Sequence, residues 1–419
     1  MTGSVIVWDH KDDPPDEIGQ VLCWQSYAHG GQVCSVPRYL EDHAVGLRAK
    51  YLAFIHDLGE IRIGGKRVVD HLDMGDGFSF WWMTPLAEKS PLKSPRIYDC
   101  LRLLALEEIL LDRKPSGLTL HSSNPELSQA VRRLCRSLRI AFTWQRGKKC
   151  PQEWSLRRIY HGLPYQVQGL LSLRHIVMRW PLRKLKRPQW FSGDSAVFLC
   201  SYFIHLDLAA CAQGRFQSRF WEVLPKYLHD NGRRTNWIQH FQSGTVEPDL
   251  ETGVAWLRQF NLDADRQGYH RFLDSYLTWR NVARALKIWC WLNVVTWRLR
   301  GIQPAFRPAG SAVWLWPFMR RDWFTSLCGP VAMGNCLSVE LFDAALKDIP
   351  YQRIGLYLCE NQGWERALLR AWRKYGHGKI VGVVHATVPF WHLYYFDDPR
   401  SLTSKQACAV SATRQTTTA

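Results

Sequence analysis

The stretch 356-LYLCENQGWERALLRAWRKYGHGKIVGVVHATVPFW-391 decides the fold class, because it contains a helix between two apolar runs. The apolar run 354–359 predicts a strand, and the periodic segment 364–375 predicts a helix with one apolar face. After a turn at 376–378, the apolar run 380–385 predicts a second strand. A strand, a helix and a strand at this spacing are typical of a parallel sheet covered by helices.

The same alternation recurs along the rest of the chain. Apolar or β-branched runs predict strands at 5–8, 118–121, 140–144, 196–203 and 236–241. Helical spacing of apolar residues predicts helices at 41–58, 97–111, 125–138, 216–229, 312–324 and 339–346, with a long helical region from about 264 to 299. The fold class that we expect is therefore α/β.

Length and composition allow two domains and leave the partner open. A chain of 419 residues exceeds the usual size of one domain, and a hydrophobic fraction of 46% is ample for real cores. The 54 Lys and Arg residues outnumber the 37 Asp and Glu residues, and the net charge is +17. The excess is concentrated in residues 96–188. Such a field attracts phosphates on nucleic acid, nucleotide sugars or anionic lipid, and charge alone does not choose among them.

The cysteines and the N-terminus favour a reducing compartment. None of the 12 cysteines forms a C-x-x-C pair, which argues against zinc ribbons and thioredoxin-like chemistry, and we expect no metal. The first residues, MTGSVIVWDHKDD, lack the layout of a signal peptide. We therefore expect a cytoplasmic protein with reduced thiols.

Two segments have the composition of a membrane interface. The apolar run 288–297 lies between Lys287 and Arg298, and in 169–190 cations alternate with large apolar residues. Tryptophan beside Arg or Lys suits an interfacial position. The plainer interpretation of each segment is a buried helix followed by a solvated basic loop. Because both segments occur in one basic chain, we expect peripheral contact with an anionic membrane surface.

Polar side chains cluster where the two last predicted strands end. Glu360, Gln362 and Glu365 follow the first of these strands, and His385 ends the second. In open α/β sheets ligands bind outside the carboxyl ends of the strands, and a helix N-terminus there suits phosphate. Alternatively, Glu360 and Glu365 serve the start of the helix, and His385 is a half-buried imidazole. The cluster favours a ligand site.

Several runs of the chain resemble bacterial surface-carbohydrate biosynthesis proteins of the GT-B glycosyltransferase type. They are 78-FSFWWMTPLAEKSPLKSPRIYDCLRLLALEEIL-110, 201-SYFIHLDLAACAQGRFQSRFWEVLPKYL-228 and 357-YLCENQGWERALLRAWRKYGHGKIVGVVHATVPFW-391, continued by 394-YYFDDPR-400. Together they cover most of the chain up to Arg400. The resemblance implies two Rossmann-like domains with a cleft between them, and an activated sugar as donor.

The resemblance also implies the kind of donor. The strand-end Glu360 and the later His385-Ala-Thr sequence are similar to donor-side motifs in transferases of acidic sugars such as Kdo or sialic acid. Those enzymes use CMP sugars, so a CMP-sugar is the expected donor and no separate cofactor is expected. The expected donor-binding residues are Glu360, Gln362, Glu365 and His385.

The N-terminal half would then hold a glycan or lipid-linked acceptor. A base must take the proton of the acceptor hydroxyl, and the candidates are Asp9 and His10 at the end of the first strand and Glu88 after the aromatic patch. Asp76 is a fourth candidate and an expected acceptor contact.

The aromatic patch after Asp76 is the second part of the expected acceptor site. Trp81 and Trp82 would stack on sugar rings, although paired tryptophans are more commonly found in cores. No spacing argument separates the candidate bases from one another.

The expected domain boundaries follow from the order of elements. Residues 1–260 form an N-terminal Rossmann-like acceptor domain with an inserted basic region at 147–190, and residues 261–335 form a helical bridge. Residues 336–400 form a partial nucleotide-sugar-binding domain, and the tail 401–419 is disordered. Only two strands and one helix precede that tail, so we expect a second domain that is incomplete through truncation or a frameshift.

Three functions remain in competition. The first is a glycosyltransferase of lipopolysaccharide, capsule or O-antigen synthesis, cytoplasmic and peripheral at the inner membrane, active if its C-terminal domain is functional. The second is a non-catalytic remnant or scaffold of the same family. A nucleic-acid-binding protein is disfavoured, because the aromatics lack a suitable context and the carboxylates Glu360 and Glu365 repel phosphates.

Overall fold

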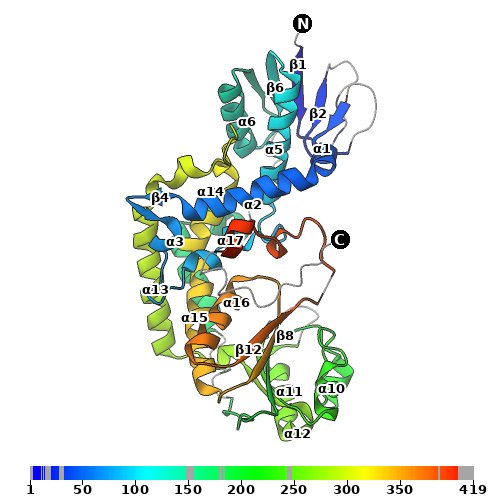
Figure 1. Ribbon diagram of the computed structural model, residues 1–419, viewed down its shortest axis with the longest axis vertical. Helices are drawn as coiled ribbons and strands as arrows, with labels where there is room; N and C mark the ends of the chain where they lie inside the picture. The colour runs from blue at the N-terminus through cyan, green and yellow to red at the C-terminus, as the bar shows by residue number, and fades with distance from the viewer. Residues whose placement is uncertain are drawn as a thin grey trace. The chain divides into compact units, whose positions relative to one another are not determined.

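The computed structural model describes residues 3–10, 12, 14, 20–27, 33–147, 155–178, 182, 185–242, 248–385 and 387–403. The chain divides into two compact units (Figure 1). Unit 1 comprises Met1–Pro164, Val294–Ser326 and Pro389–Ser404, and unit 2 comprises Tyr165–Asn293, Leu327–Val388 and Lys405–Ala419. Each unit contains a five-stranded parallel sheet flanked by helices, so the predicted α/β class is confirmed.

The sheet of unit 1 has the strand order β3-β2-β1-β6-β7. Its strands are β1 (Ser4–Trp8), β2 (Val21–Cys23), β3 (Val33–Ser35), β6 (Gly117–His121) and β7 (Ala141–Gln145). β1 and β6 pair in parallel from Ser4↔Gly117 to Trp8↔His121, so these two strands end side by side. Side chains at their carboxyl ends are therefore held close together.

The helices of unit 1 bury its core. α5 (Arg96–Arg113) contributes most, with ten buried side chains. Asn124 caps α6, because its side chain accepts from the amides of Glu126 and Leu127 and Pro125 follows it. The elements between and after the strands are α1 (Val36–Asp42), α2 (Ala44–Glu60), the hairpin β4 (Arg62–Ile63) and β5 (Lys66–Arg67), α3 (Val68–His71), η1 (Phe80–Met83), α4 (Pro85–Glu88), α6 (Pro125–Leu138) and α7 (Leu156–Gly162), and later η4 (Arg300–Ala305), α14 (Trp316–Leu327), η5 (Leu393–Tyr395) and α17 (Pro399–Thr403).

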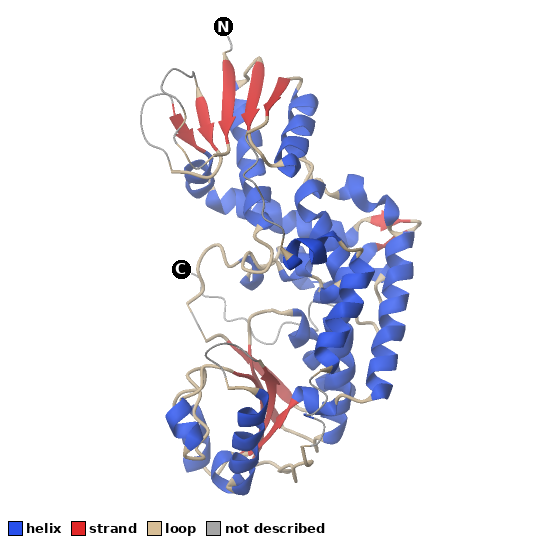
Figure 2. Cartoon of the chain, turned by 180° about the vertical axis from the view of Figure 1, so that it is seen from behind, coloured by secondary structure: helices blue, strands red, loops and turns tan. Residues whose placement is uncertain are grey.

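The sheet of unit 2 has the strand order β10-β9-β8-β11-β12. Figure 2 shows the strands of both sheets in red and the helices around them in blue. Its strands are β8 (Ala196–Phe203), β9 (Arg234–Phe241), β10 (Tyr269–Phe272), β11 (Ile354–Leu358) and β12 (Lys379–Val383). Every residue of β8 is buried, as a central strand covered on both faces requires.

The helices of unit 2 pack on this sheet and on one another. Trp372 of α16 packs on Phe198 of β8 with ring centroids 5.1 Å apart, and Gly355 leaves room for its ring. The helices are α8 (Tyr165–Val177), α9 (Leu208–Ala212), α10 (Leu224–Asp230), α11 (Leu250–Leu262), α12 (Ala264–Gln267), η3 (Leu273–Tyr276), α13 (Trp279–Arg298, which continues into unit 1), α15 (Pro330–Asp348) and α16 (Gly363–Lys374).

The second sheet is not the fragment that the sequence led us to expect. The boundaries expected from the sequence place β8 and β9 in an N-terminal domain that ends at residue 260, and β10 in a helical bridge over 261–335. In the structure β11 pairs directly with β8. Local periodicity predicts a strand without showing which sheet the strand joins. The partner of β11 lies some 150 residues earlier in the chain, and no local signal reports that pairing.

The predicted exposure of the last apolar residues is only partly found. Val384, Val388 and Phe390 are exposed by more than a third, whereas Leu393 and Tyr394 are buried. Two expectations fall partly outside the described residues. Of the expected disordered tail 401–419 only residues 401–403 are described, and they form the end of α17. Of the basic segment 169–190, the cations Arg179, Arg183 and Lys184 lie outside the described residues. Within the described chain, no helix is long and apolar enough to cross a membrane.

Candidate functional site

The sheet of unit 2 reverses its direction of growth between β8 and β11. From β8 the chain adds β9 and β10 on one side, and it then returns to add β11 and β12 on the other. Helices leave such neighbouring strands on opposite faces, which opens a crevice at their carboxyl ends where ligands bind in open α/β sheets. The fold therefore places a candidate site beyond Phe203 and Leu358.

Glu360 and His385 meet at this edge. His385 Nε2 lies 3.5 Å from Glu360 Oε1, and both side chains are partly exposed. The contact follows from the pairing of β11 with β12, as the order of the two strands led us to expect. His385 Nδ1 is buried and has no hydrogen-bond partner among the described residues. The pair therefore retains an unused polar atom next to a carboxylate.

Glu365 does not belong to a ligand-binding surface. Its side chain is buried, with the residue 1% exposed. Its carboxylate accepts from the backbone amides of Glu360 and Gln362 at Oε1 and of Asn361 at Oε2, at 2.8, 3.0 and 3.1 Å. These bonds close a capping box at the start of α16. The prediction that Glu365 contacts a donor is therefore wrong, because its oxygens bind the loop itself.

Gln362 has an intermediate role. It is the N-cap residue of α16, and its side-chain amide donates to Glu360 Oε2. Asn361 before it takes the left-handed conformation with φ of 56°, which is uncommon for a residue other than glycine. Gln362 therefore orients Glu360 while remaining partly exposed itself.

A cavity of about 660 Å³ lies at the carboxyl end of β8. Its walls are two facing segments, joined by an antiparallel bridge between Leu206 and Ser218 and by a hydrogen bond from Arg219 N to His205 O. The volume falls within the range of roughly 300–1,000 Å³ that is usual for small-molecule sites. The lining side chains are those of His205, Leu206, Asp207, Leu208, Gln217, Ser218, Arg219, Glu222 and Val223.

Aromatic contacts connect this cavity to the Glu360–His385 pair. The ring of Phe220 lies edge-on to His205 at 5.1 Å and to His385 at 4.7 Å between centroids. Phe220 follows the cavity residue Arg219 directly in the sequence. The cavity and the carboxylate–histidine pair therefore form one continuous edge of the sheet.

Arg219 gives this edge a cation that can bind an anion. The residue is exposed, and no described side chain forms a hydrogen bond or ion pair with its guanidinium group. His205 and Glu222, on the same walls, have left-handed φ values of 51° and 39°. Such conformations cost about 1–3 kcal/mol each and often occur at functional sites. A guanidinium group with free donors is well suited to bidentate binding of a phosphate.

The sheet of unit 1 has a switch point of the same kind between β1 and β6. Asp9 follows β1, and its carboxylate accepts from Ser122 Oγ and from Gln25 Nε2, each at 2.6 Å. Ser122 follows β6 and Gln25 follows β2, so three neighbouring strands contribute to one cluster. His10 and His121 each contact the ring of Trp8, with centroids 4.9 and 5.0 Å from it.

The surroundings of Asp9 change its acidity. Burial raises the pKa of this carboxyl above its usual value, although the hydrogen bonds from Ser122 and Gln25 oppose that rise. Burial also lowers the pKa of His121, and the nearby His10 adds to that shift. A carboxylate whose pKa is raised is suited to accept a proton. Asp9 is thus the strongest of the predicted bases.

The other residues predicted for the acceptor side lie elsewhere in unit 1. Trp81 is 1% exposed and packs in the core, the more common position for a tryptophan. Glu88 is buried and forms an ion pair with Lys93 at 2.7 Å. Asp76 lies in an exposed turn, where it accepts from the amide of Phe78. The predictions that Trp81 stacks on a sugar and that Glu88 is a free base are therefore wrong.

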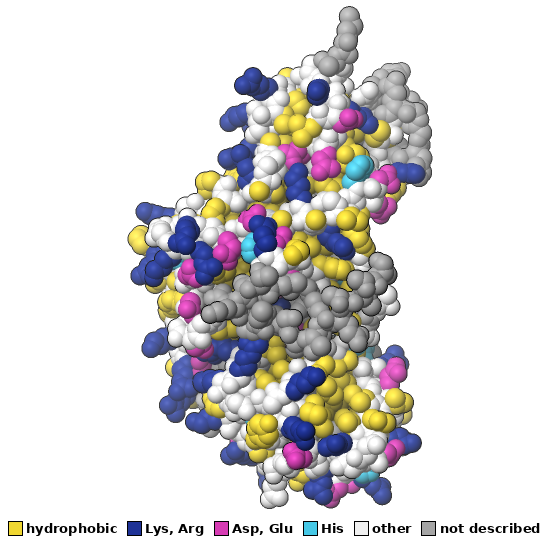
Figure 3. Space-filling view, in the orientation of Figure 1, with side chains coloured by type: hydrophobic (Ala, Val, Ile, Leu, Met, Phe, Trp, Pro, Cys, Tyr) yellow, Lys and Arg dark blue, Asp and Glu magenta, His cyan; other side chains and the backbone are white. Residues whose placement is uncertain are grey.

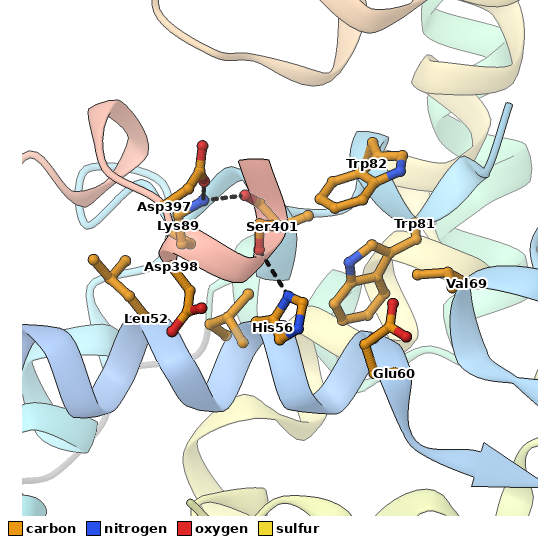
Figure 4. Close-up of a pocket in the computed structure, with 13 residues that line it drawn as sticks. Leu52, His56, Glu60, Val69, Trp81, Trp82, Lys89, Asp397, Asp398 and Ser401 are labelled. Atoms are coloured by element: carbon orange, nitrogen blue, oxygen red, sulfur yellow. Dashed lines mark hydrogen bonds and ion pairs between the residues drawn. The ribbon is translucent and has the colours of Figure 1, made fainter. Parts of the chain in front are cut away.

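Trp82 lies at a small pocket of unit 1 (Figure 4). The last described segment closes this pocket, because Lys89 binds Asp397 at 2.8 Å and His56 binds Ser401 at 2.9 Å. The space inside is about the size of one water molecule, so Trp82 has no room to stack on a sugar here.

The fold and the two sheet edges define a class of protein. It has two open parallel α/β sheets, each with polar side chains at its switch point. Protein-family models, curated proteins and solved structures give no match to this chain. Among the described residues, no three His, Cys, Asp or Glu side chains gather closely enough to hold a metal ion.

Sequence reasoning missed four residues of these edges. His205 and Arg219 were missed because the expected boundaries place strand 196–203 in the other domain. The rule that ligands bind beyond the carboxyl ends of strands was therefore applied to Glu360 but not to the end of strand 196–203. Ser122 directly follows the correctly predicted strand 118–121, and the same rule would have found it. Gln25 follows β2, a strand of three residues that gives no periodic signal.

Proposed function

We propose that the chain is a glycosyltransferase-like protein of surface-polysaccharide synthesis that binds a nucleotide sugar, of the CMP type, in unit 2. The observation that carries the proposal is the combined edge at the switch point of unit 2, where Arg219 and the Glu360–His385 pair flank a cavity of about 660 Å³. Arg219 binds the phosphate, and Glu360 accepts hydrogen bonds from hydroxyl groups of the ribose or sugar.

Acceptor binding is assigned to unit 1 in the same proposal. The acceptor hydroxyl oxygen attacks the anomeric carbon of the donor while the bond from that carbon to the phosphate oxygen breaks. The nucleotide leaves with the bonding electron pair, and the hydroxyl proton passes to a base. Asp9 is the base that the observations favour, because its pKa is raised and it is partly accessible, and His10 is next to it.

Calorimetric titration tests the donor half of this proposal. CMP and a CMP-sugar are added to the purified chain, with UDP and GDP as competitors of different charge and base. We expect CMP-type ligands to bind, and Arg219→Ala and Glu360→Gln each to weaken binding by roughly 10- to 100-fold. That range corresponds to about 1.5–3 kcal/mol for a hydrogen bond to a charged group.

Arg215 provides the matched control. It lies in the same loop as Arg219 and pairs with Gln213, outside the walls of the cavity. Arg215→Ala should therefore bind CMP as the unchanged chain does. If neither CMP nor its sugars bind, the donor proposal is wrong and a non-catalytic scaffold of the same fold becomes the better interpretation. Binding without release of CMP in the presence of acceptor lipids would also favour the scaffold.

A further inference from the structure

α13 presents an exposed face with large aromatic residues at both ends. Trp279 and Trp297 are each 65% exposed, and they are separated by about five helical turns, so they lie on the same side. Between them the exposed surface carries Cys290 and Val294. In the first half of the helix Ala283 is the exposed side chain without charge between Trp279 and Cys290, so the apolar surface is largest toward the C-terminal end of this face. We call the exposed face of α13 the α13 face.

Cations flank that apolar centre. Arg280, Arg284, Lys287 and Arg298 are exposed on one side of it, and the helix contains no acidic residue. Of the four, only Arg284 has an acidic partner within the described chain, namely Glu340 at 3.7 Å. Figure 3 shows Lys and Arg side chains gathered along the edge where Figure 1 places α13.

The opposite side of α13 is fixed in the core. Val282, Ala285, Leu292 and Val295 are buried, and Trp289 donates from Nε1 to the Cys328 carbonyl at 2.9 Å. The helix cannot rotate to bury Trp279 and Trp297 without losing this packing. The exposure of the α13 face is therefore built into the fold.

A neighbouring helix adds further apolar surface. α8 exposes Val167, Leu170 and Leu171, at 39, 48 and 41%, and Met178 directly after it is 69% exposed. Its Gly169 lies against the carbonyl oxygen of Cys328, the same oxygen that Trp289 of α13 binds. Two helices with exposed apolar faces therefore meet at the start of α15.

We propose that the α13 face docks the protein on an anionic membrane surface, with α8 beside it. Interfacial helices combine a large apolar stripe with flanking Lys and Arg, and tryptophan favours the depth of the lipid headgroups. The charge complementarity selects anionic lipid over a neutral surface. A nucleic-acid surface is disfavoured, because the cations lie beside the apolar stripe and not at its centre.

Vesicle sedimentation tests this proposal with the full chain. Vesicles of phosphatidylcholine alone are compared with vesicles that contain 30% phosphatidylglycerol, at 150 mM salt. We expect recovery with the anionic vesicles only. Lys287→Glu combined with Arg298→Glu should lower the partition coefficient by at least roughly thirtyfold, since each cation near an anionic leaflet contributes about a fivefold factor.

Two further variants separate the parts of the α13 face. Trp279→Ser combined with Trp297→Ser should also reduce binding while leaving the helical circular dichroism unchanged, because both side chains are mostly in solvent. The matched control is Lys226→Glu with Arg258→Glu, two exposed cations on α10 and α11. The control should sediment with anionic vesicles as the unchanged chain does, although its net charge falls by the same amount.

Cys290 reports the contact directly. It is the one exposed cysteine among those that the structure describes, and Cys150 and Cys408 can be replaced by Ser. An environment-sensitive dye on Cys290 should shift to shorter wavelength with anionic vesicles. Equal recovery on neutral and anionic vesicles, no recovery on either, or equal loss in the control would overturn the proposal, as would binding with no change in the dye.

Discussion

Burial and hydrogen bonding shift the pKa of the Glu365 carboxyl group in opposite directions. Three backbone amides favour its charged form, but burial is the larger effect and raises its pKa to about 7. The same carboxylate accepts a hydrogen bond from the backbone amide of Glu360. Protonation of Glu365 should therefore affect how the loop holds Glu360 in the proposed donor site. Glu365 can therefore support the proposed donor site without contacting a ligand.

Replacing Glu365 by Gln should change how stability depends on pH. Because the folded pKa lies above the unfolded value of about 4.5, the folded chain retains a proton that the unfolded chain releases between pH 4.5 and 7. The free energy of unfolding should therefore fall as the pH rises through that window, by about 1.4 kcal/mol per unit of pKa difference. Urea unfolding at several pH values measures the difference between the two chains. Parallel curves would show that this pKa is not raised.

Ser122→Ala should raise the pKa of Asp9 further. The hydroxyl of Ser122 donates to the Asp9 carboxylate at 2.6 Å and favours its charged form, so its loss leaves burial less opposed. Carboxyl NMR titration measures the pKa, and Ser122→Thr, which keeps a hydroxyl, should restore much of it. An Asp9 pKa that is unchanged or lower in the alanine variant would contradict the assigned contact.

At the scale of elements, the sequence predicted the strands that are rich in large apolar side chains. The runs at 196–203, 236–241 and 354–359 correspond to β8, β9 and β11, because a buried parallel strand needs apolar side chains on both faces. β10 was missed, since its sequence YHRF is polar and stands inside a helical pattern. The predicted helical region 264–299 is therefore interrupted by a strand.

The limits of α15 show a different kind of miss. The apolar spacing predicted a helix only over 339–346, whereas the helix runs from Pro330 to Asp348. Proline at the first helical position was a start signal that the periodicity did not use. The candidate site was also predicted only in part. Glu360 and His385 were predicted because each follows or ends a predicted strand. Arg219 could be found only by knowing that β8 pairs with β11.

Gly268→Ala should destabilise unit 2 more than Gly376→Ala. Both glycines have positive φ, 83° and 68°, so both variants lose roughly 1–2 kcal/mol to the left-handed backbone. A Cβ at Gly268 would also lie 2.6 Å from the backbone oxygen of Thr235, whereas a Cβ at Gly376 meets nothing within 4 Å. Thermal unfolding should show the larger loss for Gly268→Ala. Equal losses would contradict the close approach at the start of β10.

At the scale of the whole molecule, the order of strands makes unit 2 discontinuous in sequence. Its central strand β8 is paired by β9 on one side and by β11 on the other. The two elements that the sequence suggested as a separate fragment, β11 and β12, therefore complete a sheet that begins near residue 196. The stability of the unit should depend on both parts together.

Ending the chain at residue 350 tests this dependence. The truncation removes β11, α16 and β12 from unit 2, and also η5 and α17 from unit 1. It exposes an edge of β8 and the ring of Phe198 that Trp372 covers. We expect unit 2 to unfold and the product to aggregate, because an unpaired apolar strand edge is prone to association. A soluble fragment with the secondary structure of residues 1–350 intact would instead support the earlier interpretation of a separate C-terminal fragment.

The most direct test of the central claim is hydrogen–deuterium exchange of the full chain with and without CMP. If the switch-point edge of unit 2 binds the nucleotide, protection should appear in three segments, 204–223, 359–363 and 384–385, and should disappear in the Arg219→Ala variant. The exchange of unit 1 around Asp9 should be unchanged by CMP alone. Protection confined to unit 1, or no protection at saturating CMP, would contradict the assignment of the donor site.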